Sequence, residues 1–252
     1  NRQKVLNAMR ELGYTPSAAA RTLAKGKTGI IGLIAPSMED PFFNSVIKSI
    51  NYCLLNRGYF LAISLHDEIN NDEINGIYIG KNYLFQDGRV DGIIILSPTN
   101  ENEYIQELEQ KGLPFILIDN QESHTDIFSI IVDNYKGGYD ITKYLLNLGH
   151  TKIGFIGGND IYLSARERRR GFIDALKDFN LEPFIIEDGD FTIGTGYEIM
   201  EKWIKNDKIP TAVFASDDKI ALGAINACQA HNIKVPQDIS ICGYDNLLIA
   251  AE

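Results

Sequence analysis

The sequence predicts an α/β protein built from two parallel sheets, each covered by helices on both faces. Nine short apolar runs are rich in β-branched residues, and helix-length amphipathic segments separate most of them. Continuous Ile, Val and Phe runs are typical of strands buried on both faces, and strand–helix alternation is typical of parallel sheets. Nine strands could form one sheet, but the 252-residue chain suits two lobes better.

The expected strands and helices alternate along the chain and form two series. The strand candidates cover 28–36, 59–65, 90–97, 114–119, 129–133, 152–158, 183–189, 211–216 and 239–245. The helix candidates cover Phe42–Arg57, Asn102–Lys111, Tyr135–Leu148, Ala165–Phe179, Gly194–Lys205 and Lys219–His231. We therefore expect an N-terminal lobe over 29–132 and a C-terminal lobe over 133–252.

Charge is distributed unevenly between the front of the chain and the rest. The chain has a formal net charge of −10, whereas residues 1–28 hold six basic residues and one acidic residue, a net charge of +5. The remainder therefore carries −15. A basic arm on an acidic body indicates that only the arm is attracted to a polyanion, the alternative being a solvated terminal tail.

Cysteine and histidine usage argues against disulfides and metal sites. Cys53, Cys228 and Cys242 show no paired spacing, and we interpret them as reduced core thiols of a cytoplasmic protein. The four histidines are scattered, so the sequence predicts neither a metal nor a cofactor. No apolar run approaches the roughly 18 residues of a membrane span, and no signal-peptide core appears. Because the chain lacks an initial Met and stops at "GYDNLLIAAE", we expect a longer protein.

Small or polar residues follow the carboxyl ends of several expected strands. These residues are Ser37, Asp40, Asp119, Gly157, Gly158, Asp217, Asp218 and Asp245. Ligands of open parallel sheets bind at the carboxyl ends of strands, so two facing lobes would place these groups around one cleft. A helix N-cap is the simpler explanation of any single Asp, and Asp217 before "DKIALGA" is a candidate for that role.

Common catalytic and nucleotide-binding motifs are absent from the sequence. The glycines at 157–158 and 194–196 lack the third glycine of a dinucleotide-binding loop, and Walker A, G-x-S-x-G and H-E-x-x-H sequences do not occur. Adjacent residues of a strand point to opposite faces, so Asp217 and Asp218 do not form a cooperating carboxylate pair. We therefore predict that the protein is not an enzyme.

The basic stretch "SARERRRGF" (164–172) contains one arginine that helical spacing directs inward. Phe172, Leu176 and Phe179 mark the expected buried stripe of the helix, and Arg168 lies one turn before Phe172. A guanidinium at this position can donate two hydrogen bonds to ligand hydroxyls or to a carboxylate. The alternative is a structural ion pair.

Three phenylalanines stand in loops or at helix starts, where a large apolar side chain needs a reason. They are Phe42, Phe43 and Phe191. Sugars and bases present flat faces that stack on aromatic rings, so these residues are candidates for ligand contacts. Trp203 has plain helical spacing and is expected in the core.

Two short helices are expected before the first strand. Residues 3–12 form an amphipathic helix that ends at Gly13, and its apolar face has no partner in this sequence. A second helix over 16–24 begins with proline and ends near Gly26. Leu23 is its only large aliphatic residue, so this short helix has no core face and needs an external partner to order it.

These residues carry a resemblance to a known family. "ELGYTPSAAARTLAKGKTGIIGLI" resembles the hinge of the lactose-repressor/galactose-repressor family of bacterial transcription regulators. The stretches "DPFF", "RVDGIII", "LGHTKIGFIGG", "SARERRRGF", "GDFTIGTGY", "PTAVFASDDKIALGA" and "VPQDISICGYDN" match the effector-binding core of that family in order. The resemblance implies a periplasmic-binding-protein-like fold of two lobes. It also implies that residues 1–13 are the last helix of a truncated helix-turn-helix headpiece and that residues 14–28 are the hinge helix and linker.

The resemblance also implies roles for individual residues. The positions matched to effector contacts are Phe42, Phe43, Asp119, Arg168, Phe191, Asp217 and Asp245. The positions matched to DNA contacts are Arg21, Leu23, Lys25 and Lys27. Leu23 would enter the minor groove, and the basic residues would attract phosphates. Position 217 is often Asn in the family, so Asp217 is expected to alter ligand preference.

The same resemblance implies that the protein is a cytoplasmic transcriptional repressor. It would bind a pseudo-palindromic operator as a homodimer, and a small sugar or sugar derivative bound between the lobes would control its operator affinity. An alternative is a periplasmic-type sugar-binding receptor that serves a transporter. The basic stretch 14–28 and the missing secretion signal argue against a receptor. A sugar-processing enzyme, the third reading, would need a reactive pair in the cleft.

Overall fold

The computed structural model describes residues 2–13, 26–65, 84, 88–98, 101–122 and 126–251. Over these residues the chain divides into two compact units. The first comprises Asn1–Glu39, Phe43–Leu96 and Asn102–Ile116, and the second comprises Asp40–Phe42, Ser97–Glu101 and Leu117–Glu252. Both units contain strands alternating with helices.

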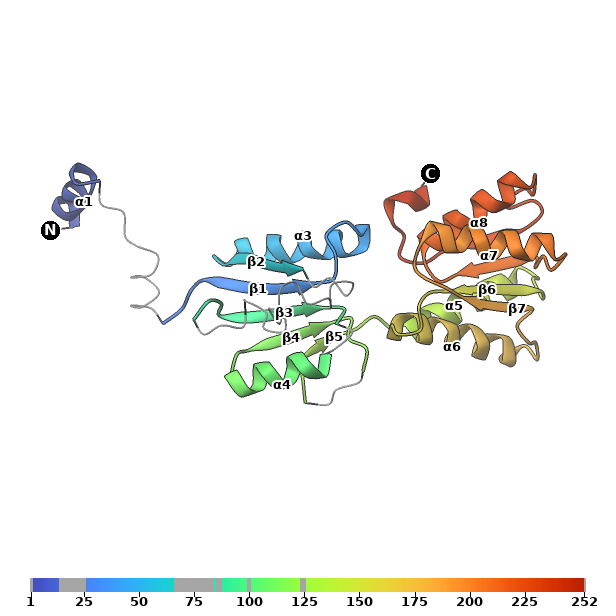
Figure 1. Ribbon diagram of the computed structural model, residues 1–252, viewed down its shortest axis with the longest axis horizontal. Helices are drawn as coiled ribbons and strands as arrows, with labels where there is room; N and C mark the ends of the chain where they lie inside the picture. The colour runs from blue at the N-terminus through green and yellow to red at the C-terminus, as the bar shows by residue number, and fades with distance from the viewer. Residues whose placement is uncertain are drawn as a thin grey trace, which may run out of the picture. The chain divides into compact units, whose positions relative to one another are not determined.

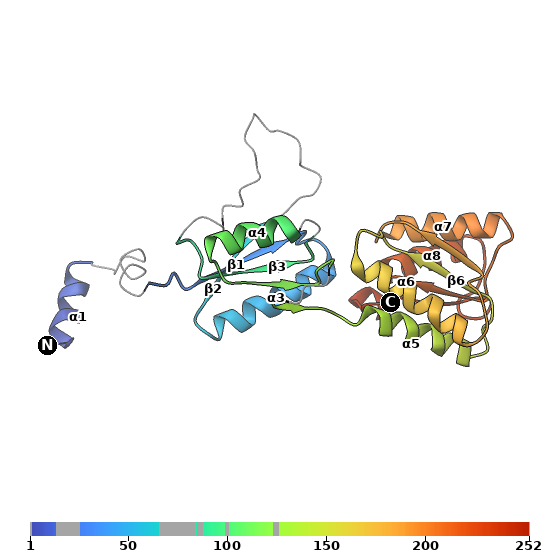
Figure 2. The same cartoon turned by 90° about the horizontal axis from the view of Figure 1, so that it is seen from below.

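The first sheet has five strands in the order β2-β1-β3-β4-β5. Their bounds are Ile30–Ala35 for β1, Phe60–Leu65 for β2, Gly92–Leu96 for β3, Phe115–Ile118 for β4 and Ser129–Ile130 for β5. Strand β1 pairs in parallel with β2 and β3, and β4 pairs in parallel with β5. The helices α3 (Pro41–Leu55) and α4 (Glu101–Lys111) lie on opposite faces of this sheet (Figure 1 and Figure 2).

The second sheet has four parallel strands in the order β7-β6-β8-β9. Their bounds are Ile153–Gly157 for β6, Ile185–Asp188 for β7, Ala212–Ala215 for β8 and Ser240–Cys242 for β9. The helices of this unit are α5 (Asn134–Asn147), α6 (Leu163–Asp178), α7 (Ile193–Lys205) and α8 (Asp218–Ala230), followed by the 3-10 helix η3 (Leu248–Ala251). Helices α5 and α6 cover one face of the sheet, and α7 and α8 cover the other (Figure 2).

Side-chain alternation along β8 divides the core of this unit into two layers. Ala212 and Phe214 pack in the cluster that also holds Phe172 of α6, whereas Val213 and Ala215 pack in the cluster of α7 and α8. This alternation is what a strand buried on both faces requires. The structure thus confirms the α/β fold class with two parallel sheets, and each expected strand and core helix is present within a few residues of its predicted bounds.

Glycines allow the helices of each pair in the second unit to approach one another closely. A Cβ at Gly138 of α5 would overlap the carbonyl oxygen of Arg168 in α6, and a Cβ at Gly171 would overlap that of Tyr135. On the other face, a Cβ at Gly223 of α8 would overlap a carbonyl oxygen of α7. The two helix pairs therefore cross with backbone against backbone, and no larger residue fits at these points without a shift.

The structure tests the predicted burial of Trp203, of Phe179 and of the three cysteines. Trp203 is 1% exposed and lies in the core as predicted. Phe179 was expected in the buried stripe of its helix, but this was wrong, because α6 ends at Asp178 and the Phe179 side chain is 41% exposed beyond the last turn. The prediction of three core thiols was wrong for Cys53, which is exposed on α3, while Cys228 is buried and Cys242 half-buried.

The front of the chain contains helix α1 (Arg2–Glu11), which ends as predicted at Gly13 with a φ of 59°. Val5 of this helix and Leu12, which directly follows it, are 58% and 81% exposed. Within the described residues the apolar face of α1 is thus left largely uncovered. The expected second helix over 16–24 lies outside the described residues.

Candidate functional site

The carboxyl edge of the second sheet gathers most of the predicted effector residues. Small or polar residues follow each strand of this sheet, at the point where the chain leaves the buried core. The candidate ligand residues lie at these positions or a few residues further along the chain. Gly158 follows β6, Phe191 follows β7, Asp217 follows β8 and Asp245 follows β9. Parallel strands bring their carboxyl ends to one edge of the sheet, which is the usual location of ligand sites in open α/β structures.

Arg168 is the central cation of this edge and is 7% exposed. Its Nε donates to Asn134 Oδ1 at 2.9 Å, its Nη1 to the carbonyl of Ser216 at 2.6 Å, and its Nη2 to Asp245 Oδ1 at 3.2 Å. The guanidinium also stacks on the Tyr244 ring, with 3.7 Å from Cζ to the ring centroid. Helical spacing correctly predicted the inward position, and the guanidinium is held in one orientation by protein groups.

The close crossing of α5 and α6 explains why Arg168 can reach these partners. Gly138 lets α5 touch the backbone of Arg168, which places Asn134, the first residue of α5, beside the guanidinium. Gly137 on the same turn makes room for the Tyr244 ring, since a Cβ there would overlap the phenol oxygen. The arginine is therefore positioned by two adjacent glycines that a simple hydrophobic pattern does not explain.

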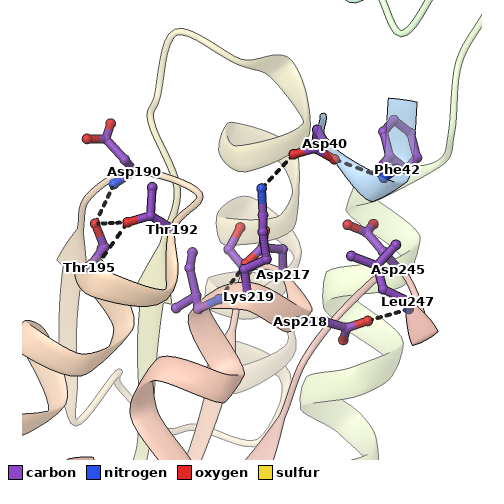
Figure 3. A network of polar contacts seen from close by, with 12 residues as sticks. Asp40, Phe42, Asp190, Thr192, Thr195, Asp217, Asp218, Lys219, Asp245 and Leu247 are labelled. Atoms are coloured by element: carbon purple, nitrogen blue, oxygen red, sulfur yellow. Dashed lines mark hydrogen bonds and ion pairs between the residues drawn. The ribbon is translucent and has the colours of Figure 1, made fainter. Parts of the chain in front are cut away.

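Asp245 lies on a loop that a second carboxylate supports. The backbone N–H of Leu247 donates to Asp218 Oδ2 at 2.6 Å (Figure 3), and Asp218 itself is 7% exposed. Burial raises the pKa of Asp245 above its usual range, although the charge of Arg168 acts in the opposite direction. Asp218 therefore positions the loop, whereas Asp245 presents a carboxylate at the site.

Asp217 is both the predicted helix cap and a candidate ligand group. Its Oδ1 accepts from the backbone N–H of Ile220 at 2.7 Å and so caps α8. Burial raises the pKa of its carboxyl to about 6. The argument that Asp217 and Asp218 alternate along a strand was wrong, because β8 ends at Ala215 and the two residues form the cap and first residue of α8.

Asp119 follows β4 and belongs to the second unit. Its Oδ2 accepts from the Ser97 hydroxyl at 3.1 Å. Burial raises the pKa of Asp119 above its ordinary value, while the hydrogen bond from Ser97 and the charge of Arg168 oppose this effect. Asp119 is thus a third desolvated carboxylate in the electrostatic neighbourhood of Arg168.

Unusual backbone conformations mark this set of residues. Among the described residues, seven non-glycine residues have positive φ. Asn180, Asp207 and Asn232 follow the ends of α6, α7 and α8, where this conformation is a common helix stop. The other four are Ser97, Asp119, Asp245 and Asn246, and all follow strand ends. Backbone strain that no helix end explains is typical of functional sites.

The three predicted aromatic contacts are all half-buried. Phe191 lies over Gly158, where a Cβ would overlap its ring, and packs edge-on against Tyr162 at 5.8 Å between centroids. Phe42 and Phe43 are the second and third residues of α3. Phe191 thus covers the end of β6 with an aromatic face near the carboxyl edge.

Lys219 is another cation that contacts the carboxylates of this edge, and the sequence did not predict this role. Its Nζ donates to Asp40 Oδ2 at 2.6 Å and lies 3.9 Å from Asp217 Oδ2 (Figure 3). The other Asp40 oxygen accepts from the backbone N–H of Phe42 at 2.9 Å. In the sequence, Lys219 looked like an ordinary surface residue of a helix, and no local signal reveals its partner 179 positions away.

Three further residues at this edge were also missed. Asn134 resembles a helix-start residue in sequence, Ser216 a strand end, and Tyr244 part of an apolar strand. Their proximity to Arg168 comes from tertiary packing alone. Only the polar character of Asn134 and Ser216 beside buried runs could have drawn attention to them.

The predicted DNA contacts are mostly outside the described residues. Arg21, Leu23 and Lys25 all lie there, whereas Lys27 is described and exposed. Just after Lys27 the chain is fastened by Asp91, whose two oxygens accept from the backbone N–H groups of Thr28 and Gly29 at 2.6 Å and 2.9 Å. Burial would raise the pKa of Asp91, but these hydrogen bonds lower it overall. Asp91 thus fixes the point at which the basic segment joins β1.

Metal-binding clusters and membrane-spanning helices are both lacking in the part of the chain that the structure describes. There, no group of three or more His, Cys, Asp or Glu side chains is arranged to hold a metal ion. No helix in the same part of the chain is long and apolar enough to span a bilayer.

Comparisons with known proteins agree on the class of protein. A family model described as periplasmic binding proteins and sugar binding domain of LacI family matches residues 28–251. The chain is 38% identical over 250 residues to the HTH-type transcriptional repressor PurR of Pasteurella multocida strain Pm70, covering 96% of this chain and 72% of that protein.

Two solved structures are similar over nearly the whole chain. A lac repressor dimer bound to operator and the anti-inducer ONPF has a TM-score of 0.82 at 25% identity, covering 98% of this chain and 74% of that chain. A complex of the transcriptional regulator CelR with cellobiose has a TM-score of 0.77 at 25% identity, covering 99% and 75%.

These matches define a regulator built on the fold of periplasmic binding proteins. The chain belongs to the LacI family, as its hinge and core motifs predicted. Its curated relatives are transcriptional repressors, and the prediction that the protein is not an enzyme is confirmed by this kinship.

Proposed function

We propose that this protein is a cytoplasmic DNA-binding transcriptional repressor that acts as a homodimer on a pseudo-palindromic operator and responds to a small polar effector. Residues 1–13 belong to its DNA-binding headpiece and residues 14–28 to its hinge. The exposed apolar residues of α1 support this assignment, because the helix needs a partner that the described residues do not supply.

The extent of the similarity to repressors carries the proposal. The family model begins at residue 28, but the PurR alignment leaves only about 4% of this chain uncovered, fewer residues than the segment 1–27 contains. Similarity to a repressor therefore extends into the basic front segment. A sugar-binding receptor would share the core alone, so the receptor alternative is not favoured.

The hinge is the proposed DNA wedge of the repressor. Two hinge helices of a dimer would enter the minor groove, with Leu23 inserted between base steps and Arg21, Lys25 and Lys27 contacting phosphates. Asp91 supports this role by fixing Thr28 and Gly29, the residues that connect the hinge to β1. Hinge position is thereby tied to the first sheet.

Effector control is the second part of the proposal. Arg168, Asp217, Asp245, Asp119 and Phe191 are the proposed effector residues in the second unit, because they combine buried charges, strained backbone and an aromatic face. Phe42 and Phe43 are proposed as additional aromatic contacts. Effector and operator would be coupled reciprocally, each changing the affinity for the other by the same factor.

Selection of DNA sequences tests the repressor assignment directly. The full-length protein, with its headpiece, is incubated with random duplexes at a fixed salt concentration, and the bound duplexes are sequenced. We expect enrichment of one pseudo-palindromic motif. Recovery of no motif from the full-length protein would overturn the proposal.

Leu23→Ala tests the wedge within the same assay. Loss of the wedge is expected to weaken specific binding roughly tenfold or more, because the DNA bend loses its support. The matched control is Leu248→Ala, which removes the same side chain from a position that is 94% exposed. The wedge idea fails if specific affinity of the Leu23 variant stays within a factor of about two.

Asp91→Ala tests the junction between hinge and core. We expect operator affinity to fall roughly three- to tenfold while the melting temperature of the core changes little, because the three hydrogen bonds to Asp91 are near the surface. Operator titration and thermal melting measure the two effects separately. Equal operator affinity for variant and wild type would show that Asp91 does not position the hinge.

A further inference from the structure

Gln121 is a buried polar residue to which the proposed effector contacts give no role. It lies in the segment 119–122, which directly follows β4, and it is 7% exposed. Its Oε1 accepts from the backbone N–H of Leu163 at 2.6 Å, and its Nε2 donates to the backbone carbonyl of Asp119 at 2.9 Å. A buried amide group needs such partners, because leaving its polar atoms unbonded is costly. The side chain therefore joins two segments that lie 42 positions apart in the sequence.

The start of α6 differs from the starts of the other helices in the second unit. Each of α5, α7 and α8 is preceded by a residue whose side chain accepts a hydrogen bond from a backbone N–H in the first turn, and these residues are Asp133, Thr192 and Asp217. Tyr162 precedes α6, and its side chain does not cap the helix. The N–H of Leu163 is one of the four that a helix leaves without an intrahelical partner. Gln121 thus supplies, from a distant segment, the cap that α6 lacks locally.

Arg166 of α6 makes the reciprocal connection. Its side chain reaches back to the residues before the helix, where Nη1 donates to the backbone carbonyls of Asp160 and Ile161 at 2.7 Å and 2.8 Å. Its Nη2 donates to the backbone carbonyl of Gln121 at 2.9 Å. One hydrogen bond therefore runs from the backbone of α6 to the Gln121 side chain, and another runs from the Arg166 side chain to the Gln121 backbone. We call these two bonds the clasp.

Both sides of the clasp lead to residues proposed to bind the effector. On one side, Gln121 holds the carbonyl of Asp119, whose backbone has a φ of 56°. A non-glycine residue keeps this conformation only where its surroundings hold it. On the other side, the first turn of α6 leads directly to the buried Arg168. The clasp thus connects a carboxylate and a cation that come from different segments of the chain.

We propose that Gln121 is a positioning residue, which acts through the clasp to hold Asp119 and the start of α6 in register and is not itself a contact of the effector. The proposal rests on the proposed function and adds a residue outside the effector contacts. When the clasp opens, Asp119 can leave its left-handed conformation, and water gains access to its carboxylate. Because segment 119–122 directly follows β4, the same opening loosens the connection between β4 and α6.

Hydrogen exchange in the first turn of α6 tests the cap. Gln121→Met removes both hydrogen bonds of the amide group at similar side-chain length, so exchange of the peptide that contains Leu163 is expected to quicken about tenfold. Gln121→Glu keeps an acceptor at the same place, so its exchange should stay within about threefold of wild type. Gln229→Met is the matched control, since it makes the same change at an exposed position of α8. Equal loss of protection in Gln121→Glu and Gln121→Met would overturn the cap.

Titration of Asp119 tests positioning, because a cap that only stabilises α6 would leave it unchanged. Burial raises the pKa of this carboxyl, while the hydrogen bond from Ser97 and the charge of Arg168 lower it and the charge of Asp245 raises it. In Gln121→Met we expect the pKa of Asp119 to fall toward its ordinary value, since the carboxylate becomes hydrated. Carbon NMR of labelled aspartate follows the titration, and the signal lost in Asp119→Asn provides the assignment.

Arg166→Met breaks the clasp from the other side. The charge lost in this variant can only raise the pKa of a nearby carboxyl, so a fall in the pKa of Asp119 has to come from opening of the clasp. We expect such a fall. The double variant with Gln121→Met should show little further change, because both substitutions break the same connection. Arg169→Met is the control on the same helix and should not lower the pKa, since Arg169 pairs with Asp188 outside the clasp.

The outcomes are distinct from those of the DNA selection. A pKa of Asp119 that stays raised in both Gln121→Met and Arg166→Met would overturn the positioning role. A fall in both variants, with no fall in Arg169→Met, supports it. Neither measurement needs a ligand or DNA, so a selection that recovers no motif would overturn the repressor assignment and leave the result on the clasp standing.

Discussion

The two helix pairs of the second unit are built alike, and each covers an apolar cluster, but the charges that they bury differ. Helices α5 and α6 cross over Gly138 and Gly171, and α7 and α8 cross over Gly196 and Gly223. Beneath α7 and α8 the buried cluster is apolar and contains Trp203. At the start of α5 and α6, by contrast, Arg168 and Asn134 form a buried polar network. Crossing over glycines thus supports an apolar core on both faces, with a buried cation in α6 on one face and the buried carboxylates of Asp217 and Asp218 at the start of α8 on the other.

Arg168→Met is expected to give the largest effect, because it removes the cation from the polar pair of helices. Methionine keeps much of the volume but leaves Asp245 buried without its partner, which costs about 3–5 kcal/mol of unfolding free energy. Urea unfolding measures the loss. Arg169→Met is the control on the same helix, where the exposed pair with Asp188 at 2.6 Å contributes no more than about 1 kcal/mol. Equal losses in both variants would contradict the buried network.

Asp217→Asn is expected to change the pH dependence of stability. Asp217 binds its proton more tightly in the folded than in the unfolded chain, since its pKa is raised from 3.8 to about 6. Its contribution to stability therefore decreases as pH rises from about 4 through 6. At pH 8 the Asn variant should be more stable than wild type by no more than about 3 kcal/mol. The advantage should vanish below about pH 4.

The charged groups that act on Asp217 are Lys219, Arg168 and Asp245, and the variant retains all three residues. Chemical unfolding of both proteins between pH 4 and 8 measures the difference. A constant difference across this range would show that Asp217 keeps its usual pKa in the folded protein.

Gly138→Ala and Gly223→Ala should cost similar, smaller amounts, about 1–3 kcal/mol each, because a Cβ overlaps a backbone oxygen at either crossing. Their spectroscopic effects should differ. Trp203 is the single tryptophan and lies in the cluster of α7 and α8, so its fluorescence should respond to Gly223→Ala and much less to Gly138→Ala.

Gly194→Ala is the control for both glycine variants. Its added Cβ would lie 3.8 Å from the nearest atom, so it should be neutral or slightly stabilising in a helix. A loss of stability in this variant as large as in the crossing variants would mean that helix propensity, and not close packing, determines the result.

The sequence predicted the fold well because its apolar runs and helical periodicities are local signals. Arg168 was also located correctly, since its distance from Phe172 is one helical turn. Its partners could not be predicted, because Asn134, Ser216 and Tyr244 approach it only through packing. The prediction that Phe179 is buried was wrong for a local reason, since helical periodicity does not reveal where the last turn of α6 ends.

The close contact between Gly138 and the backbone of Arg168 has a consequence for redesign of ligand specificity. A larger residue at Gly138 would overlap the backbone of Arg168 and shift the helix that carries the arginine, whereas the guanidinium itself is held by Asn134, Ser216 and Asp245. Asp245 and Phe191 lie on loops after strands, where side chains can change at less structural cost. New specificities should therefore arise by substitution of these loop residues around an unchanged arginine, both in laboratory selection and in natural divergence.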